Sequence, residues 1–321
     1  MVGADTAWII VATALVLFMT LPGLSLFYGG LVRSRNVLSV FMHCYAIACL
    51  MSVLWFAFGY SIAFGESSSG YWGGLGKAFL SDINTDSLSG TLPEILFFAF
   101  QMTFAIITPA LIVGAYVERI GFAFVLIFSS LWMLICYAPV VHWIWGGGIL
   151  SSGGILGDVG VVDFAGGIVV HETAGIAALI IAFCLGPRRN KTTPPHNPGF
   201  VMIGAAMLWV GWFGFNGGSQ LAMGSAADVN DISNIYINTN LAAAGGVVVA
   251  IIITMLYYKK TDLTMALNGA LGGLVAITAE PLAPSPMLAI FIGAIGGLIV
   301  VVSIPLLDKF KIDDVVGAIP A

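Results

Sequence analysis

Charge is scarce in this sequence. Only 8% of its residues are Asp, Glu, Lys or Arg, whereas 59% are hydrophobic, and the mean hydropathy is +1.02. A soluble domain carries about 25% charged residues, because its surface must hold water. The composition therefore excludes a water-soluble protein and indicates a chain that lies in a lipid bilayer.

Cysteine and histidine are also few, with four of each. The cysteines fall in or near apolar segments and are interpreted as packing residues. The histidines lack the spacing of a metal site, and neither a phosphate-binding loop nor a nucleophile elbow is present. We therefore expect no enzyme, no cofactor and no metal. The formal net charge of -5 disfavours a nucleic-acid partner.

What the sequence does have is a series of apolar runs, each near the roughly 20 residues that cross a bilayer as a helix. The runs are continuous rather than alternating, which excludes barrel strands and predicts an all-α polytopic membrane protein. We predict a single transmembrane domain over 1–321, with a tenth span that begins near Val315. The nine complete spans are 7–31, 38–64, 92–115, 122–143, 163–186, 198–218, 236–258, 265–281 and 287–307.

The basic residues are distributed unevenly among the predicted loops. Ten of the 11 follow odd-numbered spans, and Lys77 is the exception. By the positive-inside rule those loops are cytoplasmic, which places the N-terminus outside an inner (plasma) membrane. The ten are Arg33, Arg35, Arg119, Arg188, Arg189, Lys191, Lys259, Lys260, Lys309 and Lys311.

The two halves of the chain show weak sequence similarity to each other. Asp163-Phe-Ala-Gly-Gly precedes His171 by eight residues, and Asp313-Asp314 opens the tenth segment. Five spans per repeat would invert the second copy relative to the first. We expect repeats at about 7–186 and 198–321, the second of them incomplete.

His171 lies within a predicted span, where an ionisable side chain is costly and is by default a functional candidate. The alternative is a neutral imidazole that is hydrogen-bonded between helices. A neutral imidazole both donates and accepts, so it can line a path for a small amine or relay a proton. Glu172 points to another side of the helix and is interpreted as structural or subunit-facing.

Asp163 begins the same span, and its simplest role is to cap free backbone amides. Its charge would also favour a cation at the entrance. Trp145, which precedes three glycines, and Ser219 would offer a π face and a hydroxyl to a small cation, a contact worth about 2 kcal/mol or more once water is removed. Most membrane aromatics are packing residues or interface anchors. Those near the outer ends are Phe100, Phe104, Trp143, Trp145, Trp212, Phe213 and Phe215.

Several motifs follow one another along the chain, and together they closely resemble the bacterial Amt/Mep/Rh ammonium transporters. They include Leu26-Phe-Tyr-Gly-Gly-Leu-Val-Arg, Trp145-Gly-Gly-Gly, Asp163-Phe-Ala-Gly-Gly, Val170-His171 and Gly211-Trp-Phe-Gly-Phe-Asn. The resemblance implies the ammonium-transporter fold, with 11 spans and inverted five-helix repeats. It also implies a homotrimer with one pore per subunit, and a PII signalling protein as a partner at the cytoplasmic face.

By this resemblance, Phe104, Trp145 and Ser219 match an outer ammonium recruitment site, which Asp163 organises without touching the ion. Phe104 and Phe215 match a phenyl gate, and His171 matches the first of two pore histidines. We place Trp212 among the pore and gate residues as well. The chain ends before the second pore histidine, so we expect a truncated form of a longer parent.

Three functions stay open. The leading hypothesis is channel-like ammonium uptake, in which ammonium is deprotonated and ammonia passes an apolar pore. A second is an ammonium sensor of the same fold, coupled to a cytoplasmic signalling domain. A third, a sodium-coupled carrier of a small neutral solute, needs unwound segments in mid-span and fits the aromatics and His171 poorly.

Overall fold

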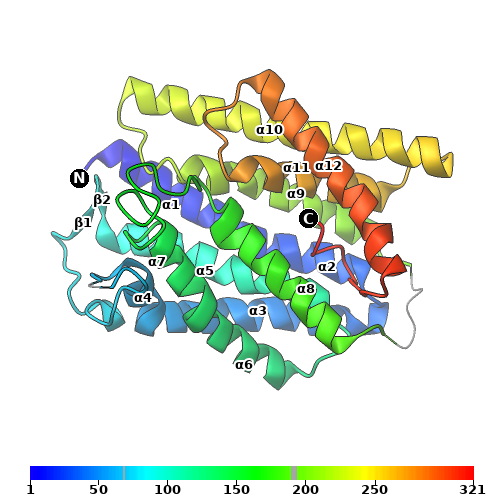
Figure 1. Ribbon diagram of the computed structural model, residues 1–321, viewed down its shortest axis with the longest axis horizontal. Helices are drawn as coiled ribbons and strands as arrows, with labels where there is room; N and C mark the ends of the chain where they lie inside the picture. Colours follow the sequence, from blue (N-terminus) through cyan, green and yellow to red (C-terminus); the bar gives the residue numbers. More distant parts are fainter. Residues whose placement is uncertain (68, 189–193) are drawn as a thin grey trace.

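The computed structural model describes residues 1–67, 69–188 and 194–321, so that Arg189 and Lys191 lie outside the described residues. The described chain is mostly helical, and its long helices run roughly along one axis (Figure 1). A short antiparallel hairpin pairs β1 (Leu88–Ser89) with β2 (Leu92–Pro93). The predicted all-α class is confirmed.

The helices follow one another along the chain with few long interruptions. Their bounds are α1 (Gly3–Phe18), α2 (Ser25–Leu31), α3 (Val37–Leu54), α4 (Tyr60–Phe64), α5 (Glu94–Tyr116), α6 (Phe122–Trp132), α7 (Ala138–Ile144), α8 (Thr173–Leu185), α9 (Pro198–Gly218), α10 (Ala226–Tyr258), α11 (Leu263–Thr278) and α12 (Pro286–Lys309). Single 3₁₀ turns occur at Ser34–Asn36 and Ala78–Leu80.

Short π-helical segments continue several of these helices into one another. They are Met19–Leu24, Trp55–Gly59, Met133–Tyr137 and Gly167–Glu172. Two of them have a proline as their cause, because proline has no N–H and its ring displaces the carbonyl four residues before it. Pro22 lies inside the first segment, and Pro139 is the second residue after the end of the third. The wider π-helical turn accommodates the loss of one backbone hydrogen bond, so the helix continues past the proline.

Eight helical stretches in the described residues are long and apolar enough to cross a membrane. The remaining predicted span, the eighth at 265–281, forms α11, which has only 16 residues. Three predictions need correction. The fifth span begins at Gly167 rather than Asp163, and the seventh begins at Ala226 rather than at 236, because Ser225 and Asp228 form a capping box there. The tenth segment, as far as residue 321, is a series of turns rather than a helix. Gly317, with a φ of 76°, adopts a left-handed conformation that interrupts a helix there.

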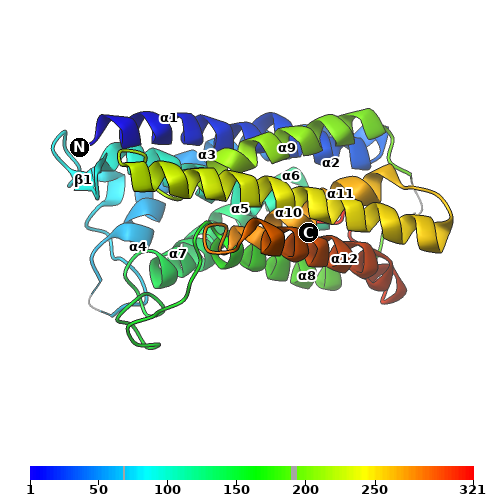
Figure 2. The same cartoon turned by 90° about the horizontal axis from the view of Figure 1, so that it is seen from above.

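Small residues let the last three helices pack closely. A Cβ atom at Gly293 on α12 would overlap the carbonyl oxygen of Ala242 on α10, and one at Gly246 would overlap that of Gly269 on α11. Close backbone approach of this kind is how helices associate in lipid. Figure 2 shows α1 and α9 along one side of the bundle and α8 and α12 along the opposite side.

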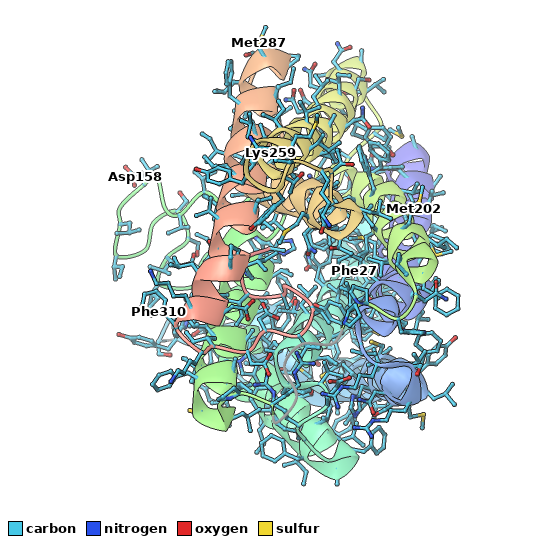
Figure 3. The ribbon with its side chains drawn as sticks, turned by 90° about the vertical axis from the view of Figure 1, so that its right-hand side faces the viewer. Phe27, Asp158, Met202, Lys259, Met287 and Phe310 are labelled. Atoms are coloured by element: carbon cyan, nitrogen blue, oxygen red, sulfur yellow. The ribbon has the colours of Figure 1, made fainter. Side chains whose placement is uncertain are left out.

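The described basic loops gather at one end of the bundle, as their sequence pattern predicts. Helices α2, α8, α10 and α12 all end at the right of Figure 1, and Figure 3 looks onto that end, where Lys259 and Phe310 are labelled. Lys77 belongs to the other end, where its Nζ pairs with the Glu94 carboxylate at 2.5 Å. Which end faces the cytoplasm stays a prediction.

A charged network joins four loops at the basic end. Arg188 donates through Nε and Nη2 to both carboxylate oxygens of Asp313, at 2.8 and 3.0 Å, and through Nη1 to Glu118, at 2.7 Å. Glu118 also accepts from the Arg33 amide and the Asn36 side chain. Burial alone would raise the pKa of both carboxyls, but these bonds outweigh it and lower the pKa of Glu118 and of Asp313.

Candidate functional site

The residues singled out in the sequence come from four separate parts of the chain. Phe104 lies on α5, Trp145 directly follows α7, and His171 lies in the π-helical segment before α8. The last part is the end of α9, which carries Trp212 and Phe215 and is followed by Ser219. The bundle brings all of them into one continuous series of contacts.

Aromatic rings form that series. The Trp145 and Phe104 rings meet edge to face with their centroids 6.0 Å apart, and the Phe104 and Phe215 centroids are 4.5 Å apart. Phe215 in turn lies 5.7 Å from the His171 ring. Phe104 and Phe215 are 1% and 0% exposed, so both phenyl rings are fully packed between Trp145 and His171.

His171 is held by its neighbours on one side and left without a partner on the other. Its ring stacks on the Trp212 indole, with centroids 5.3 Å apart and planes 9° from parallel. Its Nε2 atom is buried and has no hydrogen-bond partner among the described residues. A buried polar atom without a partner costs about 1–3 kcal/mol, which makes this nitrogen a candidate binding group for a small polar molecule.

Beyond the phenyl rings lies a small cavity that His171 lines. Its volume is about 50 Å³, enough for one or a few molecules the size of water. Apart from His171, Tyr28 and Trp212, its lining in the described structure is aliphatic, glycine or Phe27. The Tyr28 hydroxyl is already used, because it donates to the Leu111 carbonyl at 2.8 Å. The cavity is therefore apolar, with one free imidazole nitrogen at its wall.

Asp163 serves the backbone and not the cavity. One carboxylate oxygen accepts from the amides of Gly166 and Gly167, at 2.9 and 2.6 Å, and the other accepts from those of Ile168 and Val169, at 3.0 and 2.8 Å. These are the free amides at the start of the helix, as the capping interpretation expects. The fixed Asp163 carbonyl in turn accepts from the Trp145 indole at 2.7 Å.

Asp314 repeats this arrangement in the second half of the chain. Its carboxylate accepts from the amides of Gly317, Ala318 and Ile319 at 3.1, 3.1 and 2.7 Å, with a longer contact of 3.4 Å from Val316. The adjacent Asp313 instead pairs with Arg188. Of the two aspartates, the second, Asp314, is therefore the one that corresponds to Asp163.

Ser219 and Glu172 occupy different surroundings. The Ser219 hydroxyl donates to the Phe215 carbonyl at 2.9 Å, which leaves its oxygen able to accept. Glu172 is exposed on the outside of the described chain, and its role as a structural or subunit-facing residue stays a prediction.

Two of the predicted aromatics lie apart from the series. Trp143 donates its indole N–H to the Tyr71 carbonyl in the loop after α4, and the Phe213 ring packs on Tyr236 with centroids 4.8 Å apart. Phe100 does belong, since it packs against Phe104 at 5.0 Å.

One residue of the site escaped sequence analysis. Thr278, at the end of α11, accepts the indole N–H of Trp212 at 2.8 Å and so fixes the ring on which His171 stacks. Its hydroxyl also donates to the Leu274 carbonyl at 2.7 Å, which fixes the direction of its lone pairs. In the sequence, Thr278 is only a small polar residue at the end of an apolar helix.

Comparison with known proteins gives consistent matches over nearly the whole chain. Residues 7–321 match the model of the Ammonium Transporter Family. A relative from Methanothermobacter thermautotrophicus is 46% identical over 276 residues, which are 85% of this chain and 65% of that protein. An ammonium transporter of Bacillus subtilis is 43% identical over 318 residues, which are 98% of this chain and 76% of that protein.

Two solved structures share the fold at 33% identity. The first, a sensor Amt protein, has a TM-score of 0.90 over 99% of this chain and 78% of that chain. The second, Candida albicans Mep2, has a TM-score of 0.88 over 99% of this chain and 69% of that chain.

Proposed function

The chain belongs to the ammonium transporter family, and on this premise we propose that it carries ammonium, as ammonia, across a membrane. One observation supports the proposal above all others. A buried ring nitrogen of His171 lacks a partner at the wall of an apolar cavity, directly behind two closed phenyl rings. Such a wall suits a small neutral molecule that can both donate and accept a hydrogen bond.

We propose the following route. An ammonium ion binds at the outer end, beside the rings of Trp145 and Phe104 and the accepting oxygen of Ser219. It gives its proton to water at that end, and ammonia passes when the rings of Phe104 and Phe215 move apart. Beyond them, the ammonia hydrogen-bonds with His171, which Trp212 holds in place by stacking.

Desolvation is the physical reason for the deprotonation step. Moving a bare cation into an apolar interior costs tens of kcal/mol in the idealised limit, whereas ammonia only exchanges hydrogen bonds. Because no acidic side chain is among the described residues that line the cavity, no side chain there would compensate a charge. The path therefore favours ammonia over ammonium, and over potassium, which cannot lose its charge.

The test is flux into liposomes that contain the purified protein, measured with a pH dye inside them after an ammonium jump. We expect His171→Ala to lower flux by about tenfold or more, because the path loses its hydrogen-bonding group. Trp145→Leu should change apparent affinity, or selectivity over potassium, more than it changes folding. Phe213→Ala is the matched control, since that ring faces Tyr236. Wild-type flux and selectivity in both site variants would refute the pore assignment.

An ammonium sensor is the second candidate, and a specific observation favours it. The structure named a sensor Amt protein aligns with 99% of this chain. The fold described by residues 1–321 therefore does not separate a transporter from a sensor. Saturable ammonium binding without flux in the same liposomes would favour the sensor.

We also propose two halves related as inverted repeats, at about 7–186 and 198–321, on the strength of the matching caps at Asp163 and Asp314. The described basic loops at one end support a cytoplasmic location for that end and an outside N-terminus, in an inner (plasma) membrane. The exposed Glu172 and the apolar outer surfaces are compatible with a homotrimer. A PII signalling protein is the proposed partner at the cytoplasmic end.

A further inference from the structure

A second cavity opens at the basic end of the bundle, well away from the aromatic series. Its volume is about 490 Å³, nearly ten times that of the cavity beside His171. Three loops form it: the loop after α2, the loop after α5 and the end of α8. Its charged lining residues are Arg33, Arg35, Glu118, Arg119 and Arg188, which we call the arginine pocket.

The arginine pocket holds more positive than negative charge. Four guanidinium groups line it with a single carboxylate, that of Glu118. Asp313 adds one more negative charge behind Arg188. Counting both carboxylates leaves two positive charges, and one remains if Asp314, which also acts electrostatically on Arg119, is included. A site of this kind attracts an anion.

Arg119 shows that internal partners do not use up the donors. Its two terminal nitrogens donate to the backbone carbonyls of Ala115, Gly186 and Asp313. No carboxylate is among these partners, and its Nε–H is buried without any partner among the described residues. Arg35, in contrast, is exposed at the rim of the pocket and able to turn toward a ligand.

The residue type selects the class of anion. A guanidinium offers a planar fork of N–H donors that matches the oxygens of a phosphate group, and several forks around one space suit an anion with three or more oxygens. The pocket also lies at the ends of helical stretches that are long and apolar enough to cross a membrane. Basic pockets between transmembrane helices are known binding places for such headgroups.

We propose that the arginine pocket binds a phosphate group, carried either by an anionic phospholipid or by a free phosphate anion. The pocket recognises the same chemistry in both cases. The two sources differ in what else they bring, since a lipid adds acyl chains that pack against the neighbouring apolar helix surfaces. This inference stands apart from the proposed transport of ammonium, because it uses none of the residues of the aromatic series.

The experiment measures binding to the purified full chain in a neutral detergent. One arm titrates inorganic phosphate against chloride at equal ionic strength and follows thermal unfolding. A second arm adds phosphatidylglycerol or, as its neutral counterpart, phosphatidylcholine, and counts bound lipids by native mass spectrometry. Arg35→Gln and Arg35→Glu are the test variants, because Arg35 is exposed and its replacement leaves the Glu118–Arg188–Asp313 network intact.

We expect Arg35→Gln to weaken binding by about tenfold and Arg35→Glu to weaken it further, because one charge-assisted contact is lost and then replaced by repulsion. Lys259→Gln is the matched control, as an exposed cation at the same end that lies outside the pocket. Phosphate binding in the first arm supports a free anion, and selective phosphatidylglycerol binding in the second supports a lipid headgroup. The proposal is overturned if neither probe binds, or if Lys259→Gln weakens binding as much as the Arg35 variants do.

Discussion

Replacing Asp163 tests whether its carboxylate holds together the part of the site next to Trp145. Its two oxygens accept four backbone amides, those of residues 166 to 169. Hydrogen bonds to a charged group contribute about 1.5–3 kcal/mol each, so Asp163→Ala should destabilise the protein by about 6 kcal/mol. Asp163→Asn keeps one accepting oxygen but turns an amide NH₂ toward the other two N–H groups. We expect about half the loss for that variant.

Two measurements check this prediction: thermal unfolding of the purified variants, followed by intrinsic fluorescence, and ammonium flux into liposomes. We expect both the unfolding temperature and the flux to fall in the order wild type, Asn, Ala. Asp158→Ala is the control, because that exposed carboxylate stands apart from the helices in Figure 3. If the Asp163→Ala protein has the wild-type unfolding temperature and the wild-type rate of transport, the four amides need no carboxylate.

Two further predictions concern more distant groups. Thr278→Val removes the acceptor of the Trp212 indole N–H and leaves that buried donor unpaired, so flux should fall by about tenfold, while Thr278→Ser should keep wild-type flux in the same liposome assay. The lowered pKa values of Glu118 and Asp313 predict a pH dependence of stability. Their contribution is complete above pH 4.5, the ordinary pKa of the Glu118 carboxyl, and is lost as the pH falls through the lowered values in the folded state. Thermal unfolding between pH 7 and pH 3 should show this loss in the wild type and a smaller one in Glu118→Gln; equal losses would contradict the assignment.

The helical architecture could be predicted because lipid leaves the backbone few choices. A run of about 20 apolar residues in a bilayer has to form a helix, and the basic loops mark its ends. The details of those helices were harder to predict. The fifth span starts at Gly167 because the Asp163 side chain takes over the amides that a further helical turn would otherwise pair. The hydropathy of residues 163–166 does not distinguish a helix that starts at Gly167 from one that starts at Asp163.

The aromatic site was predictable in its residue types, and only partly in its members. Trp212 and Phe213 are neighbours on α9, and adjacent helical residues point about 100° apart, so one ring faces His171 while the other packs on Tyr236. The sequence does not say which of the two faces inward. Thr278 carried even less signal, because a threonine that bonds to the carbonyl four residues before it is an ordinary feature of helices.

The departures from regular helix are what hold the site together. Because the Asp163 carboxylate satisfies the amides of the following turn, the chain just after it is free to bond elsewhere. Its Phe164 amide donates to the Ala279 carbonyl at 2.7 Å, and the Ala165 amide donates to the Thr278 carbonyl at 3.2 Å. These bonds attach the start of the fifth span to the end of α11, which is the point from which the Thr278 hydroxyl reaches the Trp212 indole. The cap, the link between helices and the ring stacked on His171 are therefore parts of one construction, and a change at Asp163 should reach His171 without touching it.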